Sequence, residues 1–529
     1  MLRAMLLLAS LVSALCAQSD ERVVAVRSLQ AFRSPSLQSG NQRPFDEVDD
    51  RRELPRDASA RIDAESPEWV EKVLKSRHAR AIDSGELRLA FDESRVTLRG
   101  NKAAVNACLL DLDTMAAALS RSIEITAYRL PMPANGLPSA WSDQKSMQAR
   151  LANTPPIWSA KASTRPGGSV QLGDARWTSY VRDLDAEVAE EATIHDPKVE
   201  ASFRGVRVAV TAHALPGDDL LLHGSWRIAE GDEAVEIATG GDKPNVDFVS
   251  RGAGYVTFAG RVRSGDGLIV GAREASKDGM QFLFAVHARI VTPPGPPQGN
   301  LMVFPASAWQ AQVPARFSVY AGPFAGEERG DFGPVAELPV LSPQSLASFL
   351  GGDDGTVAMY GPTLVVDDDM AACARAERAL RELADAQLQA AELRITRKAR
   401  GERPSLAIVQ PLVAGLPAHA FVGETASMVT DYDVEIAKNA ATSNPIVQPV
   451  RGGVWSRVLG HDHGQQWHVE GLWRATDVMP ARTLHLRGAE GMLLNLPDYV
   501  NATWPWDGPM PTDRAHALAE DFEVELNAK

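Results

Sequence analysis

The chain has 529 residues and a formal net charge of −14, with 68 acidic residues against 54 basic ones. A surface of this sign repels phosphate backbones, which argues against nucleic acid as a partner. The three cysteines lie far apart and form no CxxC pair, so neither a disulfide framework nor a cysteine metal site is expected. A chain of this length should fold as several domains, each standing on its own apolar core.

The N-terminus has the pattern of a secretory signal peptide over residues 1–17. Arg3 precedes an apolar run, and small residues follow at 13–17. The protein is therefore expected to be exported and to work in the periplasm or the outer membrane. Cys16 raises the alternative of lipidation, but Leu15 before it is bulkier than a bacterial lipobox favours, so ordinary cleavage nearby is preferred.

Residues 18–66 are polar, charged and contain proline, and they predict a flexible N-terminal segment. A small ββαβ unit is predicted next, over 67–135. Its strands are expected at 87–91 and 96–98, its helix is capped by Asn101, and a strand at 123–128 closes it. One apolar stripe follows that helix at steps of three and four residues: Val105, Cys108, Leu112, Met115 and Leu119.

A second ββαβ unit is predicted over residues 343–400. Its strands are expected at 357–360 and 364–366, and a strand at 393–396 closes it. The charge run Asp367-Asp368-Asp369 predicts a helix start favoured by the helix dipole rather than a catalytic cluster. The stripe again begins four residues after the cap: Cys373, Ala376, Leu380 and Leu383. The same small unit is therefore expected twice, with two unrelated amphipathic helices as the alternative.

A long motif also recurs, which points to an internal duplication. Residues 180–189 reappear as 428–437, and the match continues without a gap to Gly205 against Gly453. After a one-residue slip, Gly224-Ser225-Trp226-Arg227 faces Gly471-Leu472-Trp473-Arg474. A repeat at constant spacing predicts a repeated architecture.

The fold class predicted is α+β, with two tandem copies of the small ββαβ unit, each followed by an antiparallel β-rich domain. The β domains are expected at 165–292 and 401–510. The Pro-rich start of 293–342 marks it as a linker and connecting segment. Residues 511–529 form a C-terminal tail, with a helix expected from residue 513.

The repeated strand alternates apolar and acidic residues, which is typical of a half-buried strand. Three carboxylates should project from one face in each copy: Asp183, Asp185 and Glu187 in the first, and Asp431, Asp433 and Glu435 in the second. They could bind calcium or line a channel. A straight strand spreads its carboxylates along a line rather than around one point, so a solvated sheet face is the preferred interpretation.

A ββαβ unit that ends in a strand such as 391–396 and leads into a β-rich stretch resembles secretins. These are the outer-membrane ring subunits of type II and type III secretion systems and type IV pili. In the first copy, residues 266–271 look like the family's glycine-bounded apolar strand after an Asp-Gly turn, and residues 282–286 followed by 288–293 look like its closing strand. The second copy has no recognisable counterpart of these strands. The resemblance implies ring-type assembly in the envelope.

Two constellations could carry other functions. His461-Asp462-His463 with His468 could hold zinc, although the flanking glycines favour an exposed hairpin tip. Several tryptophans could form sugar-binding platforms: Trp226, Trp467, Trp473, Trp504 and Trp506. Trp226 and Trp473 recur at matched positions, which favours core packing, whereas Trp504-Pro505-Trp506 is the better candidate for a contact surface.

The sequence as a whole predicts a non-catalytic, secretin-like envelope protein, a component or accessory of a secretion or pilus-type assembly. No catalytic, cofactor-binding or metal residues are assigned, and no cofactor is expected. The partners expected are other copies of the chain in a ring and other envelope proteins, with membrane association left open. The alternatives are an adhesion or glycan-binding protein and, more weakly, a metal-dependent hydrolase.

Overall fold

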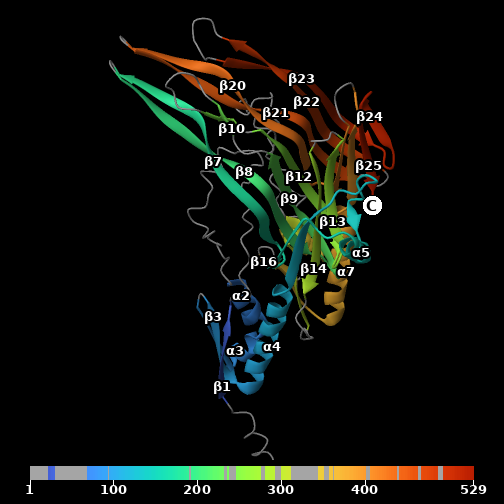
Figure 1. The fold of residues 1–529 in the computed structure, drawn as a ribbon. Coiled ribbons are helices and arrows are strands. Elements are labelled where there is room, and N and C mark those ends of the chain that lie inside the picture. Colours follow the sequence, from blue (N-terminus) through green and yellow to red (C-terminus); the bar gives the residue numbers. More distant parts are fainter. Residues whose placement is uncertain are drawn as a thin grey trace, which may run out of the picture.

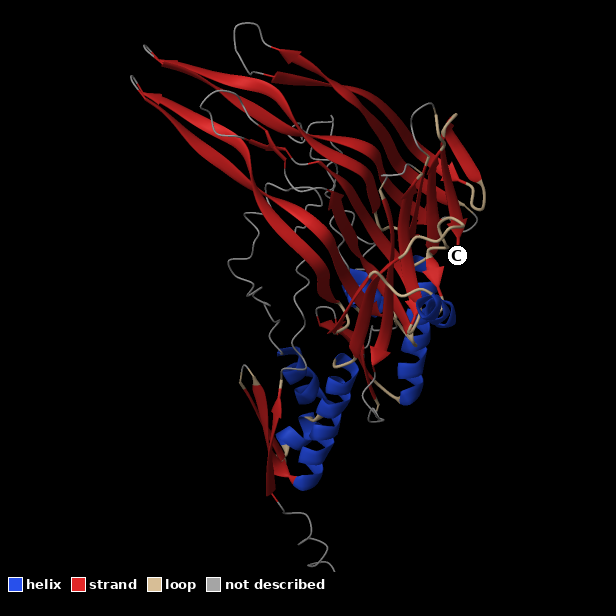
Figure 2. Ribbon diagram, in the orientation of Figure 1, coloured by secondary structure: helices blue, strands red, loops and turns tan. Residues whose placement is uncertain are grey.

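Strands dominate the chain, and two large antiparallel sheets pack face to face above two small α/β units (Figures 1 and 2). The computed structural model describes residues 22–29, 68–92, 94–189, 192–231, 235–237, 246–248, 250–275, 280–291, 300–310, 343–350, 357–360, 363–400, 405–437, 440–462, 466–485 and 493–529. The predicted signal peptide lies outside these ranges. None of the described helices is long and apolar enough to cross a membrane.

The first small unit, here called the N-unit, is a three-stranded sheet covered by helices. Its elements are β1 (Arg22–Ser28), α2 (Glu68–Arg77), α3 (Ala79–Asp83), β2 (Leu87–Phe91), β3 (Arg95–Asn101) and α4 (Lys102–Leu119), with the sheet order β1-β3-β2. Asn101 caps α4, because its side chain accepts a hydrogen bond from the Ala103 amide at 2.8 Å. The predicted stripe is buried at Val105, Cys108, Leu112 and Met115.

The second small unit, the C-unit, repeats this arrangement. It contains β15 (Leu301–Pro305), the 3₁₀ turn η3 (Ser307–Gln310), α6 (Pro343–Phe349), β16 (Val357–Tyr360), β17 (Thr363–Asp367) and α7 (Met370–Gln387), with the sheet order β15-β17-β16. Asp369 caps α7 by accepting from the Ala372 amide at 2.7 Å, as its place before the stripe predicts. Both helices have 18 residues.

The predicted ββαβ topology is wrong in its last strand. The closing strands, β4 (Ser122–Leu130) and β18 (Ala390–Arg397), leave their units and join the larger of the two main sheets. The third strand of each small sheet comes instead from upstream. It is β1, inside the segment predicted to be flexible, and β15, inside the predicted linker. The reason is burial, because Ile123, Ile125 and Ala127 of β4 belong to the core between the main sheets.

The main sheets contain the following strands. The eight-stranded sheet has the order β23 (Leu493–Met510), β22 (Trp467–His485), β21 (Ala440–Asp462), β20 (Ala418–Ala437), β12 (Ser250–Arg263), β9 (Asp219–Gly231), β8 (Ala192–Ala214) and β7 (Gly168–Ala189). The nine-stranded sheet has the order β24 (Ala515–Ala519), β25 (Phe522–Ala528), β18, β19 (Leu406–Val413), β13 (Gly267–Glu274), β14 (Gln281–Val291), β4 and β6 (Trp158–Thr164), with β5 (Trp141–Ser142) beside β13. A short helix, α5 (Gln144–Asn153), follows β5, and β10 (Val235–Ile237) pairs with β11 (Val246–Phe248).

Each main sheet is two blocks of four strands in the same order. In the eight-stranded sheet β7-β8-β9-β12 is followed by β20-β21-β22-β23, and in the other sheet β6-β4-β14-β13 is followed by β19-β18-β25-β24. Strands β4 to β14 are called the first module here, and strands β18 to β25 the second module. The two long hairpins, β7-β8 of the first module and β20-β21 of the second, project in the same direction (Figure 1).

The predicted C-terminal helix is wrong, because that segment forms β24 and β25. These strands occupy the places that β13 and β14 hold in the first module, so the second copy does have counterparts of both strands. The turn before β24 lacks the glycine that is present in the turn before β13. Asp513, at φ +63, stands where Gly265 has φ +102. The Gly265 amide donates to the Ala288 carbonyl of β14, and the Asp513 amide donates to the Leu526 carbonyl of β25, each at 2.8 Å.

The long hairpins of the two modules have the same register. The pairing of β7 with β8 shifts between Val181 and Asp183, and the pairing of β20 with β21 shifts between Val429 and Asp431. Ala175 pairs with Gly205 as Gly423 pairs with Gly453. The pairs Leu184 with Pro197 and Tyr432 with Pro445 also match, so the correspondence seen in the sequence extends to the backbone partners.

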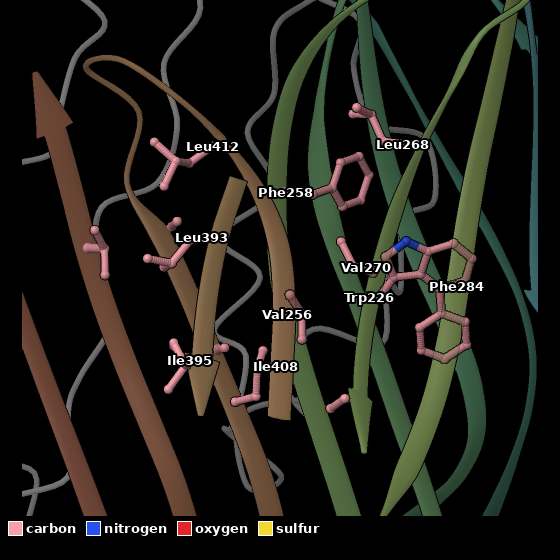
Figure 3. Close-up of a cluster of buried hydrophobic side chains, with 14 of the residues drawn as sticks. Trp226, Val256, Phe258, Leu268, Val270, Phe284, Leu393, Ile395, Ile408 and Leu412 are labelled. Atoms are coloured by element: carbon pink, nitrogen blue, oxygen red, sulfur yellow. The ribbon is translucent and has the colours of Figure 1, made fainter. Parts of the chain in front are cut away.

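One apolar core lies between the two main sheets and continues through both modules (Figure 3). Trp226 and Phe284 stack across it, with ring centroids 4.2 Å apart and planes 1° apart. From the second module Leu393, Ile395, Ile408 and Leu412 enter the same core. Since both sheets contribute on alternate residues, the two modules share one interior rather than two separate ones.

The matched glycines of the long hairpins allow a test of how closely their paired strands approach each other. A Cβ at Gly205 (φ +123) would lie 2.1 Å from the Asp174 carbonyl oxygen, and one at Gly453 (φ +145) would lie 2.3 Å from that of Val422. We expect Gly205→Ala and Gly453→Ala each to lower the free energy of unfolding by more than about 2 kcal/mol, since strain and collision add. Gly136→Ala, at φ +96 with nothing within 4 Å, measures the strain alone. Equal losses for all three variants in denaturant titrations would contradict the close approach.

Candidate assembly interface

The joint between the modules is made of backbone pairing in both main sheets. In one sheet β12 pairs with β20, from Ser250 opposite Ala426 to Val256 opposite Ala420. In the other, β13 pairs with β19, from Gly271 opposite Val409 to Glu274 opposite Leu406. Just beyond the first ladder the His419 amide donates to the Thr257 hydroxyl at 2.7 Å. The joint therefore runs through both layers.

An aromatic cluster covers the joint on the outer face of the eight-stranded sheet. Tyr255 of β12 lies directly opposite Phe421 of β20. Phe421 packs on Trp455 of β21, with ring centroids 4.1 Å apart, and both of these side chains are buried. Leu472 of β22 packs against the same pair. This cluster combines side chains of both modules, so it is specific to the joint in a way that backbone pairing is not.

A segment of the first module that the second lacks also holds the joint. Residues 131–157, here called the clasp, contain β5 and α5, whereas only residues 398–405 separate β18 from β19 in the second module. The Glu392 carboxylate of β18 accepts hydrogen bonds from the Ala140 amide at 2.6 Å and the Ser139 hydroxyl at 2.8 Å. The Lys529 ammonium lies 4.7 Å from the centre of the Trp141 ring. The clasp of the first module thus binds the second.

Buried charges meet between the layers at the same place. Arg397 of β18 lies 3.3 Å from the Asp477 carboxylate of β22 and 3.9 Å from the Glu274 carboxylate of β13. Burial raises the pKa of Glu274, and the nearby guanidinium of Arg397 works against that rise. Because Glu274 belongs to the first module and the other two to the second, these charges tie the modules together.

The two strands at the ends of the eight-stranded sheet correspond to the two strands that pair at the joint. Among the described strands β7 and β23 are its two ends. By position in the blocks β7 corresponds to β20 and β23 to β12, the two strands that pair at the joint. The side chains of the aromatic cluster are not repeated there. Gly173 stands in the place of Phe421, Arg207 in that of Trp455, and Thr503 in that of Tyr255.

The histidine candidates lie at a hairpin end, as the flanking glycines predict. His461 of β21 is directly opposite His468 of β22. His468 Nε2 is 2.9 Å from Oδ1 of the exposed Asp507. His463 lies outside the described residues. Within the described ranges no three His, Cys, Asp or Glu side chains gather as a metal site would require.

The repeated acidic residues lie on β7 and β20 immediately after the matched register shifts. The structure describes the backbone of Asp183, Asp185 and Glu187 and of their counterparts in β20, and not their side chains. The calcium and channel interpretations therefore stay predictions.

The tryptophans serve packing more than display. Trp226, Trp467 and Trp473 are buried, as their matched positions predict for the first and last. Trp504 and Trp506 are half-buried and pack against the same core, and Trp504 stacks on Phe522 with ring centroids 4.4 Å apart. This packing does not favour the alternative in which Trp504 and Trp506 form a glycan-binding platform.

A histidine pair, of which His213 is fully buried and His223 half-buried, joins the first module to the C-unit and was not predicted from the sequence. His213 Nδ1 is 3.0 Å from the Ser307 hydroxyl, and its Nε2 is 3.0 Å from Nε2 of His223. Burial lowers the pKa of His213 well below its usual value and that of His223 to about 4. The turn at residues 215–218 could have predicted the hairpin that brings these two histidines together, whereas the contact with Ser307 depends on the tertiary fold.

Comparisons with known proteins yield a weak likeness to secretins. No family model and no curated protein sequence matches the chain. Among solved structures, the Salmonella SPI-1 type III secretion injectisome secretin InvG matches with 11% identity, covering 44% of this chain and 80% of InvG at a TM-score of 0.22. The V. cholerae type IV competence pilus secretin PilQ matches with 10% identity, covering 39% and 70%, at a TM-score of 0.22. Values this low do not establish membership of the family.

Removing the carboxylate that holds the clasp should loosen the joint. We expect Glu392→Gln to lower the free energy of unfolding by about 1.5–3 kcal/mol, because the amide loses the charge that strengthens the hydrogen bonds from Ser139, Ala140 and Arg394 and sets an NH2 group against one of these donors. Limited proteolysis should then cut within residues 131–157 sooner. Glu124→Gln, which breaks exposed pairs with Lys161 and Arg289, is the control and should change little. An unchanged cleavage rate in Glu392→Gln would show that the clasp is held by other contacts.

Acid should destabilise the fold through its buried histidines. Burial also lowers the pKa of His419 to about 3. Below about pH 6.5 the histidines of the unfolded chain bind protons, whereas the folded imidazoles stay neutral because their pKa is lowered. Stability therefore falls as the pH drops toward about 4, by about 1.4 kcal/mol per pH unit for each such histidine. Denaturant titrations between pH 7 and pH 4.5 measure the slope. His419→Gln should flatten it, and a slope that stays the same in this variant would contradict the role given to His419.

Proposed function

We propose that this chain is a non-catalytic structural subunit of an assembly outside the cytoplasm, of the secretin-like kind found in secretion and pilus systems. In this proposal the two modules are diverged copies of one ancestral module, and the exported protein works in the periplasm or the outer membrane. The single observation that carries it is the order of strands, in which two blocks of the same strand order pair edge to edge while the corresponding edges remain at the two ends of the eight-stranded sheet.

This order supports head-to-tail association of chains. A strand edge presents unpaired N–H and C=O groups along its length and is a template for further pairing. Because β23 corresponds to β12 and β7 to β20, the last block of one chain has the same relation to the first block of another that the two modules have inside the chain. Such a contact joins two different surfaces, so it can repeat and close into a ring.

The contact between chains should be weaker than the joint within a chain. It would have the backbone ladder but neither the aromatic cluster nor the clasp, since Gly173, Arg207 and Thr503 replace the three aromatic residues. Only the eight-stranded sheet would contribute fully, because β24 is shorter than β13. Association is therefore expected to depend on protein concentration, with the two-module chain as its stable unit.

The register of the joint predicts which residues meet between chains. Gly252 of β12 lies opposite Glu424 of β20. The corresponding residues are Val500, which is 49% exposed on β23, and Arg176, which is exposed on β7. Like charges directly opposite each other on paired strands destabilise pairing, and opposite charges favour it.

A charge exchange at this pair tests the proposal. We expect Val500→Arg to raise the dissociation constant of chain association, measured by analytical ultracentrifugation, by about fivefold, which corresponds to about 1 kcal/mol. Val500→Glu should not raise it, and combining Val500→Arg with Arg176→Glu should restore association. Electron microscopy of the protein extracted from a native envelope fraction should show rings or arcs.

A wild-type chain that is monomeric at all concentrations, and soluble after envelope fractionation, would overturn the proposal. Equal effects of Val500→Arg and Val500→Glu, with no rescue by Arg176→Glu, would overturn the predicted edge contact. Both variants change an exposed side chain, so their unfolding transitions should match that of the wild type and serve as the folding control.

A further inference from the structure

The helices of the N-unit cover the outer face of the C-unit sheet. Leu301 and Val303 of β15 and Val365 of β17 are buried there and belong to the core of the N-unit. Their exposed fractions are 5%, 7% and 2%. Trp69 of α2 stacks on Tyr360 of β16, with ring centroids 5.9 Å apart. Three apolar residues on one sheet face are thus kept from water only because a second unit lies over them.

Charges at the rim of this contact are matched as well. Arg77, at the end of α2, is bound by Asp111 of α4, with Nε 2.8 Å from Oδ2, and by Asp367 of β17. His78 Nε2 lies 3.0 Å from the same carboxylate of Asp111. Burial alone would raise the pKa of Asp111, but the hydrogen bonds from His78 and Arg77 outweigh it and lower the pKa. Asp367 belongs to the C-unit, so this ion pair joins the two units.

The N-unit sheet has the same outer face, and there it is exposed. Val24 lies opposite Arg99, and Val26 lies opposite Thr97, as Leu301 lies opposite Asp367 and Val303 opposite Val365. Val24 and Val26 are 65% and 50% exposed. In Figure 1 this sheet lies on the side of the N-unit away from the rest of the chain. An apolar pair that is buried in one unit is therefore open in the other.

The matching helix face of the C-unit is also open. α2 and α6 end in the same way, since the His78 amide donates to the Leu74 carbonyl at 3.0 Å and the Leu350 amide donates to that of Leu346 at 3.1 Å. Phe349 therefore stands where Arg77 stands in the N-unit, and it is 53% exposed.

We infer that the Val24–Val26 face of the N-unit binds the α6–α7 face of the C-unit of another copy of this chain, with Phe349 in the rim position that Arg77 holds inside the chain. The contact inside the chain is the template, and the replacements agree with each other. Arg99 takes the place of Asp367 and Phe349 that of Arg77, so a guanidinium meets an aromatic ring where an arginine would have met an arginine. The inference rests on the self-association proposed above but uses a different surface.

Two complementary variants test this contact in the full-length protein. Val24→Asp combined with Val26→Asp spoils one surface, and Phe349→Arg spoils the other, because it places a second guanidinium opposite Arg99. We expect each to raise the dissociation constant of chain association by about tenfold, because the valine variant buries carboxylates without partners and Phe349→Arg brings two like charges together. Each variant keeps one of the two surfaces intact, so an equimolar mixture of the two should associate more tightly than either variant alone. Ile157→Asp, at a side chain that is 60% exposed elsewhere, is the matched control.

The outcomes separate this inference from the proposed function. If Val500→Arg weakens association while the valine and phenylalanine variants do not, the inference fails and edge pairing stands. If mixing the two variants gives no gain in association over either variant alone, the two surfaces do not bind each other and the inference fails. If the wild-type chain does not associate at all, both fail. All four substituted side chains are exposed, so unchanged unfolding transitions confirm that the variants are folded.

Discussion

The architecture depends on one interaction, the pairing of strand edges between the first and second modules. A half-buried block of four strands has two edges whose backbone groups need partners, and β12 with β20 and β13 with β19 satisfy one edge of each block. The shared core follows from this pairing, because side chains on both sheets then line one continuous interior. The same pairing leaves a corresponding edge at each end of the eight-stranded sheet, and self-association is proposed from that.

Backbone pairing does not choose its partner, and the side chains around the joint do. Phe421, Trp455 and Tyr255 cover it from outside, Arg397 and Glu274 bridge it from within, and Glu392 holds the clasp across it. None of these features recurs at β7 or β23. Two modules of similar backbone are thus fixed to each other inside the chain, while contacts between chains are left to the generic ladder, which suits a stable subunit of a larger assembly.

The small units follow the same principle in a different layer. Each has a helix side and a sheet side, and inside the chain the helix side of the N-unit covers the sheet side of the C-unit. The remaining sides carry Val24 and Val26 at one end and Phe349 at the other. The C-unit is also anchored to the first module, where Arg261 binds both Asp219 of that module and Asp385 of α7. Contacts in the two layers would therefore extend in step.

The sequence alone determined the features that depend on neighbouring residues. The caps at Asn101 and Asp369, the apolar stripes and the register of the two long hairpins were all predictable, because each signal lies within a few residues or repeats at constant spacing. Only the tertiary structure decided where strands find their partners. β1 came from a segment predicted to be flexible, β4 and β18 left their units, and β24 and β25 formed where a helix was expected, at a turn marked by Asp513 instead of glycine. A strand shows in its own residues that it is extended and half-buried, but its partner lies far along the chain and is selected by the burial that the whole fold makes available.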